Sequence, residues 1–347
     1  MLGSANDDLD FPLTGEPSVG GTYLVEPGLL WVHLPLPYRL NHVNAWAIDG
    51  GDAWTVIDTG IGDARTAAIW TDLLAGTLAG KPVGRVIATH FHPDHIGQAG
   101  WLVERTGASF ACSLTDWLFA KALGAGPSPG QNSAAERFYR RAGVDEATIA
   151  AVVGNGDGFA RAVRAIPPVL ERLRHGDELV LGRSAWRVIA GAGHTPEPLC
   201  LFRPDPPLLI AGDQVLPRIS PNISVWPNEP DADPLRDYLE SFGPLLALPE
   251  DVLVLPSHGK PFRGLHRRLA ALRDHHDDRL RRAAAFCREP RTAADVADAL
   301  FGGGLDPHQS MFAVGEAIAH LNHLIRRGTL TRRAGPDGVD HYTASAD

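Results

Sequence analysis

The sequence predicts a layered α/β fold with two β-sheets, followed by a small helical domain. Three observations support this prediction. β-rich segments and amphipathic helices alternate along residues 21–262, and a helical stretch over residues 113–168 separates two β-rich halves. From Leu265 onward, charged helices and one hairpin replace the mixed pattern. With 347 residues the chain can bury a large core, as one domain with an appendage or as two domains.

The first β-rich half starts with three alternating segments, LLWVHLPL, NAWAID and AWTVID, separated by the turn signals EPG and GGD. Asp63 is expected to cap the next helix, ARTAAIWTDLLAG, because its carboxylate can accept a hydrogen bond from the first turn. The apolar run GRVIATH predicts a buried strand that delivers Thr89 and His90 at its end. A helix over about residues 96–106 and the strand SFACS should follow.

The second β-rich half contains the segments DELVLG, SAWRVIAGAGHT, CLFRP and LLIAGDQV, then a helix near residues 234–247 and the strand DVLVLPSH. After Leu265, a charged amphipathic helix, a helix capped by Thr292, and a longer helix ending at Gly328 precede a hairpin around AGPDG. This order is typical of a winged-helix-like unit. The expected parts are a flexible segment at 1–20, a large α/β domain at 21–262 with an insertion at 113–168, and a C-terminal domain at 263–347.

Composition limits the function classes. The net charge of −9, from 32 basic and 41 acidic residues, disfavours nucleic acid and anionic membrane surfaces as partners. Residues 288–347 hold six arginines and eight acidic residues, a net of −2, although Arg326, Arg327, Arg332 and Arg333 leave a local basic patch open.

The three cysteines form no CxxC pair, which favours a reducing compartment. The first residues lack a basic start and an apolar run, and no stretch approaches ~18 apolar residues. We therefore expect a cytoplasmic protein without a membrane span.

The segment THFHPDHIG carries the strongest chemical signal. His90, His92, Asp94 and His95 fall within this segment on the turn that leaves a buried strand. Alternate residues of an extended segment share a face, so His90 and His92 can address one centre, while the turn lets Asp94 and His95 address a neighbouring one. Imidazole and carboxylate are ligands of borderline divalent metals, zinc foremost.

Further motifs follow in order: IDTG with Asp58, GAGHTPEP with His194, IAGDQV with Asp213, and LPSHGKPF with His258. Over about residues 20–262 this set resembles the metallo-β-lactamase superfamily, on its hydrolytic, glyoxalase-II-like side. The tail resembles that of the branch named after β-lactamase-like protein 2. The resemblance implies a four-layer αβ/βα sandwich with metals at the edge between its sheets. The turn TPEP departs from the usual TPG at Glu197, which concerns loop shape rather than metal ligation.

The resemblance also implies a ligand set for two divalent ions, zinc expected and iron or manganese possible. His90, His92 and His194 would hold one metal, and Asp94, His95 and His258 the other, with Asp213 bridging. Asp58 would orient the ligands, and Asp94 would also orient the attacking hydroxide.

We expect a metal-dependent hydrolase that acts on a carbonyl-centred substrate, a thioester or related ester, as a small molecule or linked to an acyl carrier. The alternative is a phosphodiesterase or endoribonuclease that uses the same metals. Related diiron flavoproteins replace the second histidine with glutamate and carry a flavin domain; here His92 is present and no such segment follows. A binding module with a vestigial site is the third class. A homo-oligomer is compatible with the sequence.

Substrate contacts are expected from three regions. The polar loop LPLPYRLNHVNAW offers Tyr38, His42 and Asn44 (with Asn41), and the proline-punctuated loop after Asp213 offers Arg218 and Asn222 (with Ser220). The insertion is too long and too helical for a connector. It is expected to form a lid with Phe138, Tyr139 and Arg140 as candidates, or else to add core packing.

Four of the remaining histidines lie in the C-terminal part. His275 and His276 are expected on a solvated face of the charged helix, among Asp274, Asp277 and Asp278. His320 and His323 stand three residues apart on the last long helix, where a metal pair is conceivable, but the sequence shows no third ligand.

Overall fold

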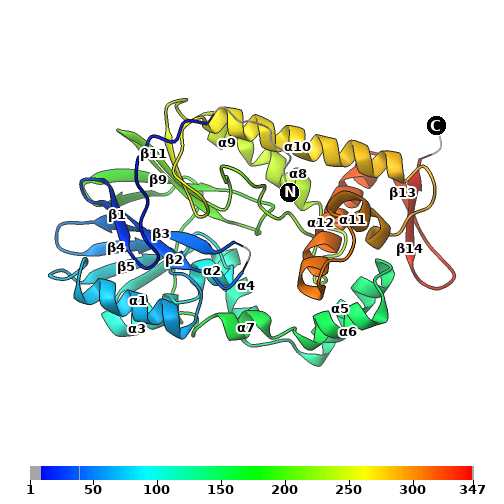
Figure 1. Cartoon of the computed structure of the whole chain (residues 1–347), viewed down its shortest axis with the longest axis horizontal. Helices are drawn as coiled ribbons and strands as arrows, with labels where there is room; N and C mark the ends of the chain where they lie inside the picture. Colours follow the sequence, from blue (N-terminus) through cyan, green and yellow to red (C-terminus); the bar gives the residue numbers. More distant parts are fainter. Residues whose placement is uncertain (1–8, 39, 346–347) are drawn as a thin grey trace.

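The structure, a computed structural model, describes residues 9–38 and 40–345. Two sheets pack face to face with helices on their outer sides, and the C-terminal helices and hairpin extend from one end (Figure 1). The first sheet has seven strands in the order β1 to β7, of which β4, β5, β6 and β7 run parallel to one another. Its strands are β1 (Thr22–Glu26), β2 (Leu29–Pro35), β3 (His42–Asp49), β4 (Trp54–Ile57), β5 (Val83–Ile87), β6 (Ser109–Cys112) and β7 (Glu171–Arg172).

The second sheet has five strands in the order β12-β11-β10-β9-β8, of which β11 and β12 run parallel. A separate hairpin pairs β13 with β14 near the C-terminus. These strands are β8 (Glu178–Leu181), β9 (Ser184–Ala190), β10 (Leu199–Pro204), β11 (Pro207–Gly212), β12 (Leu253–Pro256), β13 (Leu330–Ala334) and β14 (Asp340–Ala344).

The helices fall into three groups. Those that follow strands of the first sheet are α1 (Ala64–Ala75), α2 (Pro93–Ile96) and α3 (Ala99–Thr106). Those of the insertion are α4 (Leu114–Gly124), α5 (Pro129–Arg141), α6 (Glu146–Gly154) and α7 (Gly158–Ala162). The later ones are α8 (Pro234–Glu240), α9 (Phe242–Leu246), α10 (Leu265–Phe286), α11 (Ala293–Phe301) and α12 (Pro307–Arg326). Among the described residues, no helix is both long and apolar enough to cross a membrane.

The alternation of side chains along the strands explains the four layers. In β3, Val43 and Ala45 face a core shared with α1 and α3, whereas Trp46 and Ile48 face the second sheet. In β11, Leu209 faces the C-terminal helices, while its neighbours pack between the sheets. Because successive side chains point to opposite faces, a strand that is apolar throughout must be covered on both sides. The chain therefore folds as helix, sheet, sheet, helix.

The predicted elements occur, with one helix divided. The helix expected near residues 96–106 occurs as α3, which begins at Ala99, and the short helix α2 precedes it. The two do not join, because the backbone N–H of Gln98 donates to Gly60 outside either helix. The helix expected near residues 234–247 is split at Ser241 into α8 and α9.

The expected flexible segment 1–20 lies partly outside the described residues. Within them, Asp10 exchanges backbone hydrogen bonds with Arg263, and the ring of Phe11 lies 6.5 Å from that of Phe262. The described part of this segment is therefore tied to the start of the C-terminal region.

The insertion contributes to the core of the C-terminal helices. Phe138, Tyr139 and Ile149 from α5 and α6 are buried in the cluster that also contains Ile318 of α12 and Tyr342 of β14. Figure 1 shows α5 and α6 beside α11 and α12, away from the sheets. This packing corrects the expectation that Tyr139 contacts substrate, since only 3% of its surface is exposed and it faces other apolar side chains.

Candidate metal centre

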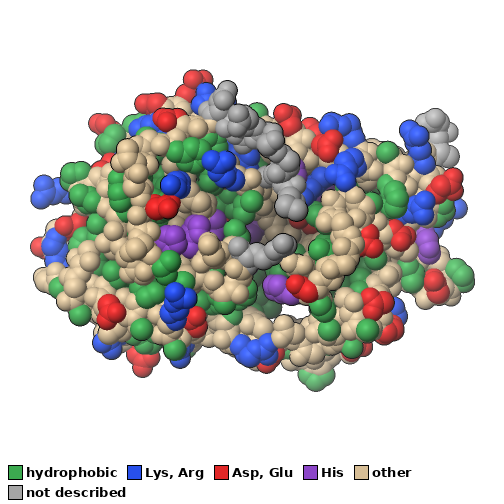
Figure 2. Space-filling view, viewed as in Figure 1, with side chains coloured by type: hydrophobic (Ala, Val, Ile, Leu, Met, Phe, Trp, Pro, Cys, Tyr) green, Lys and Arg blue, Asp and Glu red, His purple; other side chains and the backbone are tan. Residues whose placement is uncertain are grey.

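The seven predicted ligands lie where strands of the two sheets end. His90, His92, Asp94 and His95 follow β5, and the remaining three follow β9, β11 and β12 respectively: His194, Asp213 and His258. Carboxyl ends of parallel strands meet at one edge of a sheet, where open α/β proteins bind ligands. The space-filling view shows histidine side chains near the middle of one face, between the strand-rich part and the C-terminal helices (Figure 2).

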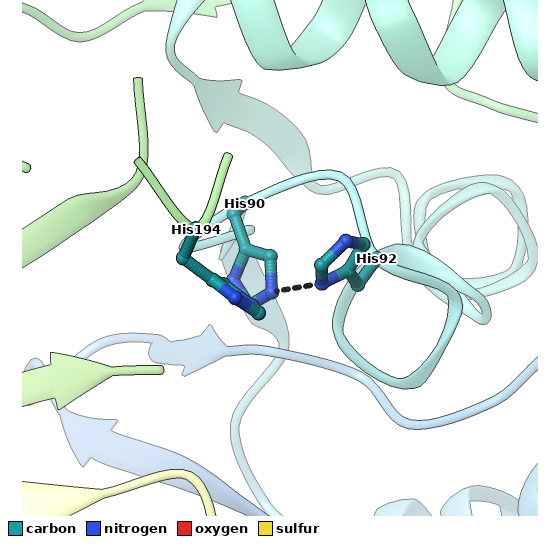
Figure 3. Close-up of side chains that lie close together, drawn as sticks. All are labelled: His90, His92 and His194. Atoms are coloured by element: carbon teal, nitrogen blue, oxygen red, sulfur yellow. Dashed lines mark hydrogen bonds between the residues drawn. The ribbon is translucent and has the colours of Figure 1, made fainter. Parts of the chain in front are cut away.

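His90, His92 and His194 converge on one point. The Nε2 atom of His90 lies 3.1 Å from Nδ1 of His92, and the rings of His92 and His194 are 4.5 Å apart. Figure 3 shows the three rings turned toward one another, two from the loop after β5 and one from the loop after β9. One nitrogen of each ring lies within 4.8 Å of the others. This is the first predicted ligand group.

Asp94, His95 and His258 form the second group. The Oδ2 atom of Asp94 is 3.3 Å from Nε2 of His258 and 3.5 Å from Nε2 of His95. Ligand atoms on one tetrahedral zinc ion lie about 3.3 Å apart, given metal–nitrogen bonds of about 2.0–2.1 Å. The spacing within this group is therefore that of a metal-binding set.

Asp213 faces both groups. Its Oδ2 lies 3.4 Å from Nε2 of His194, while its Oδ1 lies 3.5 Å from Nε2 of His258 and 3.6 Å from Nε2 of His95. One carboxylate oxygen is thus directed to each histidine group. This is the arrangement that a bridging ligand requires.

Hydrogen bonds on the outer nitrogens fix the ligand tautomers. Nδ1 of His194 donates to the carbonyl of Asn222, and Nδ1 of His258 donates to the carbonyl of His42, both at 2.8 Å. Nδ1 of His95 donates to Asp58 at 2.8 Å. Since each Nδ1 carries the proton, each Nε2 keeps a lone pair for a metal.

Asp58 and Thr89 set the tautomer of His90. The backbone N–H and hydroxyl of Thr89 donate to the Asp58 carboxylate at 2.7 and 2.8 Å. Because the hydroxyl proton goes to Asp58, Nδ1 of His90 must donate to the Thr89 oxygen 3.0 Å away. Asp58 has a positive φ of 60°, so the chain holds it in a sparsely populated conformation at this place. This fits the predicted orienting role.

The inward-facing atoms lack protein partners. Nε2 of His95, Nε2 of His194 and Oδ1 of Asp213 are buried without a hydrogen bond. Three such atoms at one point are costly in a folded protein unless a further group satisfies them. The donor set of imidazoles and carboxylates fits divalent metal ions, and zinc among them.

The charges of the centre are strongly coupled. Burial lowers the pKa of His92 to about 3, so this ring stays neutral and can bind a metal at neutral pH. Although burial lowers the pKa of His258, the carboxylates of Asp213 and Asp94 outweigh it and raise that pKa to about 10. The two carboxylates thus stabilise a positive charge next to His258. A metal cation can supply that charge in place of a proton.

One residue that joins the ligand loops was missed by the sequence analysis. The buried carboxylate of Asp116 accepts hydrogen bonds from the backbone N–H of Phe91 and from that of Glu197, both at 3.0 Å. It therefore connects the loop of His90 and His92 with the loop of His194. Its only sequence signal was an acidic residue in the first turn of a helix capped by Ser113, which indicates capping and not a site.

Gly193 shows how closely the His194 loop is packed. A Cβ atom here would lie 2.4 Å from Cβ of Tyr238 and 2.5 Å from the carbonyl oxygen of Pro234, and the φ of this residue is +95°. Only glycine tolerates both conditions. The motif GAGHT therefore places its histidine against α8.

The predicted substrate residues of the first loop have different environments. Tyr38 is 48% exposed, and its ring stacks with that of His308 on α12 at 6.4 Å. Asn44 is fully buried and donates to the carbonyls of Pro256 and Gly259, so it supports the His258 turn. His42 lies beside that turn, with Nε2 accepting from the N–H of Gly259 at 3.2 Å.

The two substrate residues predicted in the loop after Asp213 also have different environments. Arg218 is exposed, and its guanidinium lies 5.1 Å from the ring of Phe11. Asn222 accepts from His194 through its backbone, while its side chain donates to Glu316 at 3.1 Å. Asn222 is therefore oriented toward the C-terminal helices.

A second buried cluster overturns two expectations. His276 is fully buried rather than on a solvated face, and its Nδ1 lies 3.2 Å from Nε2 of His320. Glu316 stands close enough to both to complete a three-residue group. The third partner that the sequence did not reveal lies four residues before His320, one helical turn away. His323 instead pairs with Asp233 at 3.1 Å.

Comparison with known proteins identifies the family. Residues 38–258 match the family described as Metallo-beta-lactamase superfamily, and residues 280–345 match Metallo-beta-lactamase-like, C-terminal domain. The chain therefore belongs to the metallo-β-lactamase superfamily. The predicted family and the α/β sandwich are confirmed.

Two solved structures resemble most of the chain. A Beta-lactamase domain protein from Burkholderia ambifaria has a TM-score of 0.91 and 40% sequence identity, covering 99% of this chain and 100% of that one. A metallo-beta-lactamase family protein from Thermus thermophilus has a TM-score of 0.79 and 26% identity, covering 92% and 100%. The C-terminal helices are thus part of a shared fold.

Among curated proteins, the bovine and human forms of Acyl-coenzyme A thioesterase MBLAC2 are each 26% identical over 203 residues. The match covers 54% of this chain and 63% of those proteins. The chain thus spans just under two thirds of the length of these relatives.

Proposed function

We propose that the protein is a dinuclear zinc hydrolase that cleaves acyl thioesters. The observation that carries this proposal is Asp213, whose two carboxylate oxygens face two separate groups of metal-binding side chains. Two bound divalent cations would lower the pKa of a shared water to about 7 and polarise a carbonyl oxygen. The side chains present supply the ligands for this chemistry.

The protein's own residues have distinct tasks in the reaction. Asp58 and Thr89 hold His90 and His95 in the tautomers that leave Nε2 unprotonated. The Asp94 side chain is 19% exposed, more than that of Asp213, so its carboxylate is the one that water reaches first. Asp94 would therefore orient the attacking water through a carboxylate oxygen.

Tyr38 is partly exposed and close enough to Asp94 to respond to its charge, so we assign it to the substrate entrance. Burial and the negative charges of Asp94 and Asp63 raise the pKa of its hydroxyl, so it stays protonated and can donate a hydrogen bond to substrate. The rings of His308, Phe312 and Trp226 continue from Tyr38, with successive centroids 5.0 and 5.6 Å apart. This line of rings suits an acyl or carrier-linked substrate with apolar and amide groups.

The name of the MBLAC2 relatives supports a thioester as the bond cleaved.

The arginines of the tail support the exclusion of nucleic acid, because Arg332 pairs with Asp231 and Arg326 donates to the Asp231 carbonyl. Charges engaged in such pairs are less available to phosphates. All three cysteines are buried and free, which supports a reducing, cytoplasmic setting.

A substrate panel tests the proposal. Zinc-loaded protein is assayed with acyl-coenzyme A esters of several chain lengths, a lactone, a bis-aryl phosphodiester and a single-stranded RNA. We expect thioester hydrolysis that chelation abolishes and added zinc restores. Aromatic rings also stack on nucleobases, so RNA is a necessary comparison. Cleavage of RNA or phosphodiester without thioester hydrolysis would favour the phosphodiesterase alternative and overturn the proposal.

A further inference from the structure

The loop that holds His194 in place has no regular secondary structure. Between β11 and α8 the chain forms neither strand nor helix, yet the carbonyl of Asn222 in this loop accepts the Nδ1 proton of His194. The direction of His194 therefore depends on what fixes Asn222. No strand ladder does so, because the loop lies outside both sheets.

The C-terminal helices hold this loop. In α12, Glu316 accepts a hydrogen bond from the side-chain amide of Asn222 at 3.1 Å. The hydroxyl of Ser224 donates at 2.6 Å to the other end of that amide, Oδ1. Because both ends of the amide are engaged, its orientation is fixed, and the Asn222 backbone is fixed with it.

Glu316 is itself anchored. Its second carboxylate oxygen accepts from the guanidinium of Arg279 in α10, and the side chains of both residues are at most 11% exposed. A buried carboxylate with one cationic partner and one amide donor is satisfied only in this arrangement. The chain of contacts therefore runs from Arg279 to Glu316, Asn222 and His194.

Close backbone packing supports the same contact. Gly315 lies in α12 where a Cβ atom would stand 2.9 Å from the carbonyl oxygen of Val225 and 3.0 Å from Cβ of Ser224. The N–H of Val225 donates to the carbonyl of Gly315 at 3.1 Å. A glycine is thus required for the loop to lie directly on the helix.

From these contacts we propose that Glu316, anchored by Arg279, is a positioning residue that sets the direction of metal ligand His194 through Asn222. The C-terminal helices thereby tune the metal site formed by His90, His92 and His194. This inference rests on the proposed metal-dependent function. It concerns metal affinity and coordination, which can be measured without substrate.

The test compares Glu316→Gln with Asp340→Asn in the full-length protein. Asp340 is a matched control, because its side chain is also 8% exposed and also pairs with an arginine, Arg141, but it lies outside the contacts that hold Asn222. Zinc affinity is measured by competition with a chelator, and coordination is measured by the visible absorption of the cobalt-substituted protein. Thermal unfolding of the metal-free proteins reports stability separately.

We expect Glu316→Gln to weaken binding of the zinc ion at His90, His92 and His194 about tenfold and to change the cobalt spectrum. Asp340→Asn should reduce stability while leaving zinc affinity and the spectrum unchanged. If both variants lose stability alike and zinc affinity stays at the wild-type value, Glu316 has only a structural role and the inference is overturned.

A milder variant covers the case in which Glu316→Gln does not fold. Ser224→Ala removes the donor to Asn222 without leaving a buried charge, and we expect the same change in the cobalt spectrum with a smaller loss of affinity. An unchanged spectrum in this variant overturns the inference. Wild-type protein that binds no zinc or cobalt overturns the proposed function itself, so the two failures are distinguishable.

Discussion

Two buried histidine clusters can be compared within this chain. In the metal centre, His90, His92 and His194 meet at one point; among the C-terminal helices, His276 and His320 meet beside Glu316. The nearest nitrogens are 3.1 Å apart in the first cluster and 3.2 Å apart in the second. Distance alone therefore does not separate a metal site from a structural network.

The difference lies in the partners of each polar atom. In the C-terminal cluster, the Glu316 carboxylate is already paired with Arg279 and Asn222. Nδ1 of His320 donates to the Glu316 carbonyl, so its Nε2 accepts from His276. Each cluster contains buried Nε2 atoms without a hydrogen bond, including Nε2 of His276. The carboxylates differ: among the described residues, the ion-pair partners of Asp213 are all histidines. A cation would satisfy the carboxylate and nitrogen atoms of the metal centre. In the C-terminal cluster a cation would be repelled by Arg279, which already neutralises Glu316.

The largest effect is expected from Asp213→Ala. Removal of the carboxylate that faces both histidine groups leaves them without a bridge. Because metal polarisation is worth several kcal/mol, thioester hydrolysis should fall by roughly 10³-fold or more. Steady-state kinetics with an acyl-coenzyme A substrate measures this. Turnover like that of the wild type would contradict a two-metal reaction.

The zinc content of variants tests directly which of the two histidine clusters binds metal. We expect two zinc ions per chain in the wild type, about one in His92→Ala, and still two in His276→Leu, because we propose a ligand role for His92 and none for His276. Elemental analysis after gel filtration measures the stoichiometry. A loss of zinc in His276→Leu would show that the C-terminal cluster is a metal site, like the cluster at His90, His92 and His194.

Asp58→Asn should have an intermediate effect. The amide can no longer accept from both Thr89 and His95 as a carboxylate does, so His95 loses its charged partner. Loss of such an outer partner costs about 10–100-fold in metal affinity or activity. Chelator competition and kcat/KM should show this loss. Lys81→Met, which removes the partially exposed ion pair with Asp49, is the control and should leave both values unchanged.

The smallest effect concerns pH and the C-terminal cluster. Burial lowers the pKa of His320 to about 3, below its ordinary value of 6.5. Below pH 6.5 the unfolded chain therefore binds a proton that the folded chain does not bind. The free energy of unfolding consequently decreases as the pH is lowered through 6.5 toward 3. His320 should account for about 1.4 kcal/mol of the loss between pH 7.5 and 5.5.

Urea unfolding of metal-free wild type and His320→Gln at these two pH values measures that contribution. The variant is less stable at both, but its loss between pH 7.5 and 5.5 should be about 1.4 kcal/mol smaller. If wild type and variant lost the same stability between pH 7.5 and 5.5, His320 would have to be protonated in the folded protein. The expected neutral state of this histidine would then be wrong.

Much of the centre was accessible from sequence because each ligand lies in a local strand-end motif. A buried strand followed by HxHxDH carries its chemistry within a few residues, and GAGHT, IAGDQ and LPSHG each place one ligand after a further strand. The contacts that orient these ligands are distant in sequence. Asp58 and Thr89 stand 31 residues apart, and Asn222 and Glu316 stand 94 apart.

The sequence by itself therefore determined the family, the two sheets, and the residue types able to bind metal, since alternation and strand-end motifs are local properties of the chain. Only the tertiary structure decided that Tyr139 packs in the core, that His276 is buried, and that α10 and α12 hold the loop behind His194. Burial and hydrogen-bond partners depend on which distant segments pack together. A histidine in a helix has the same local sequence signal whether it faces solvent, a metal or another histidine.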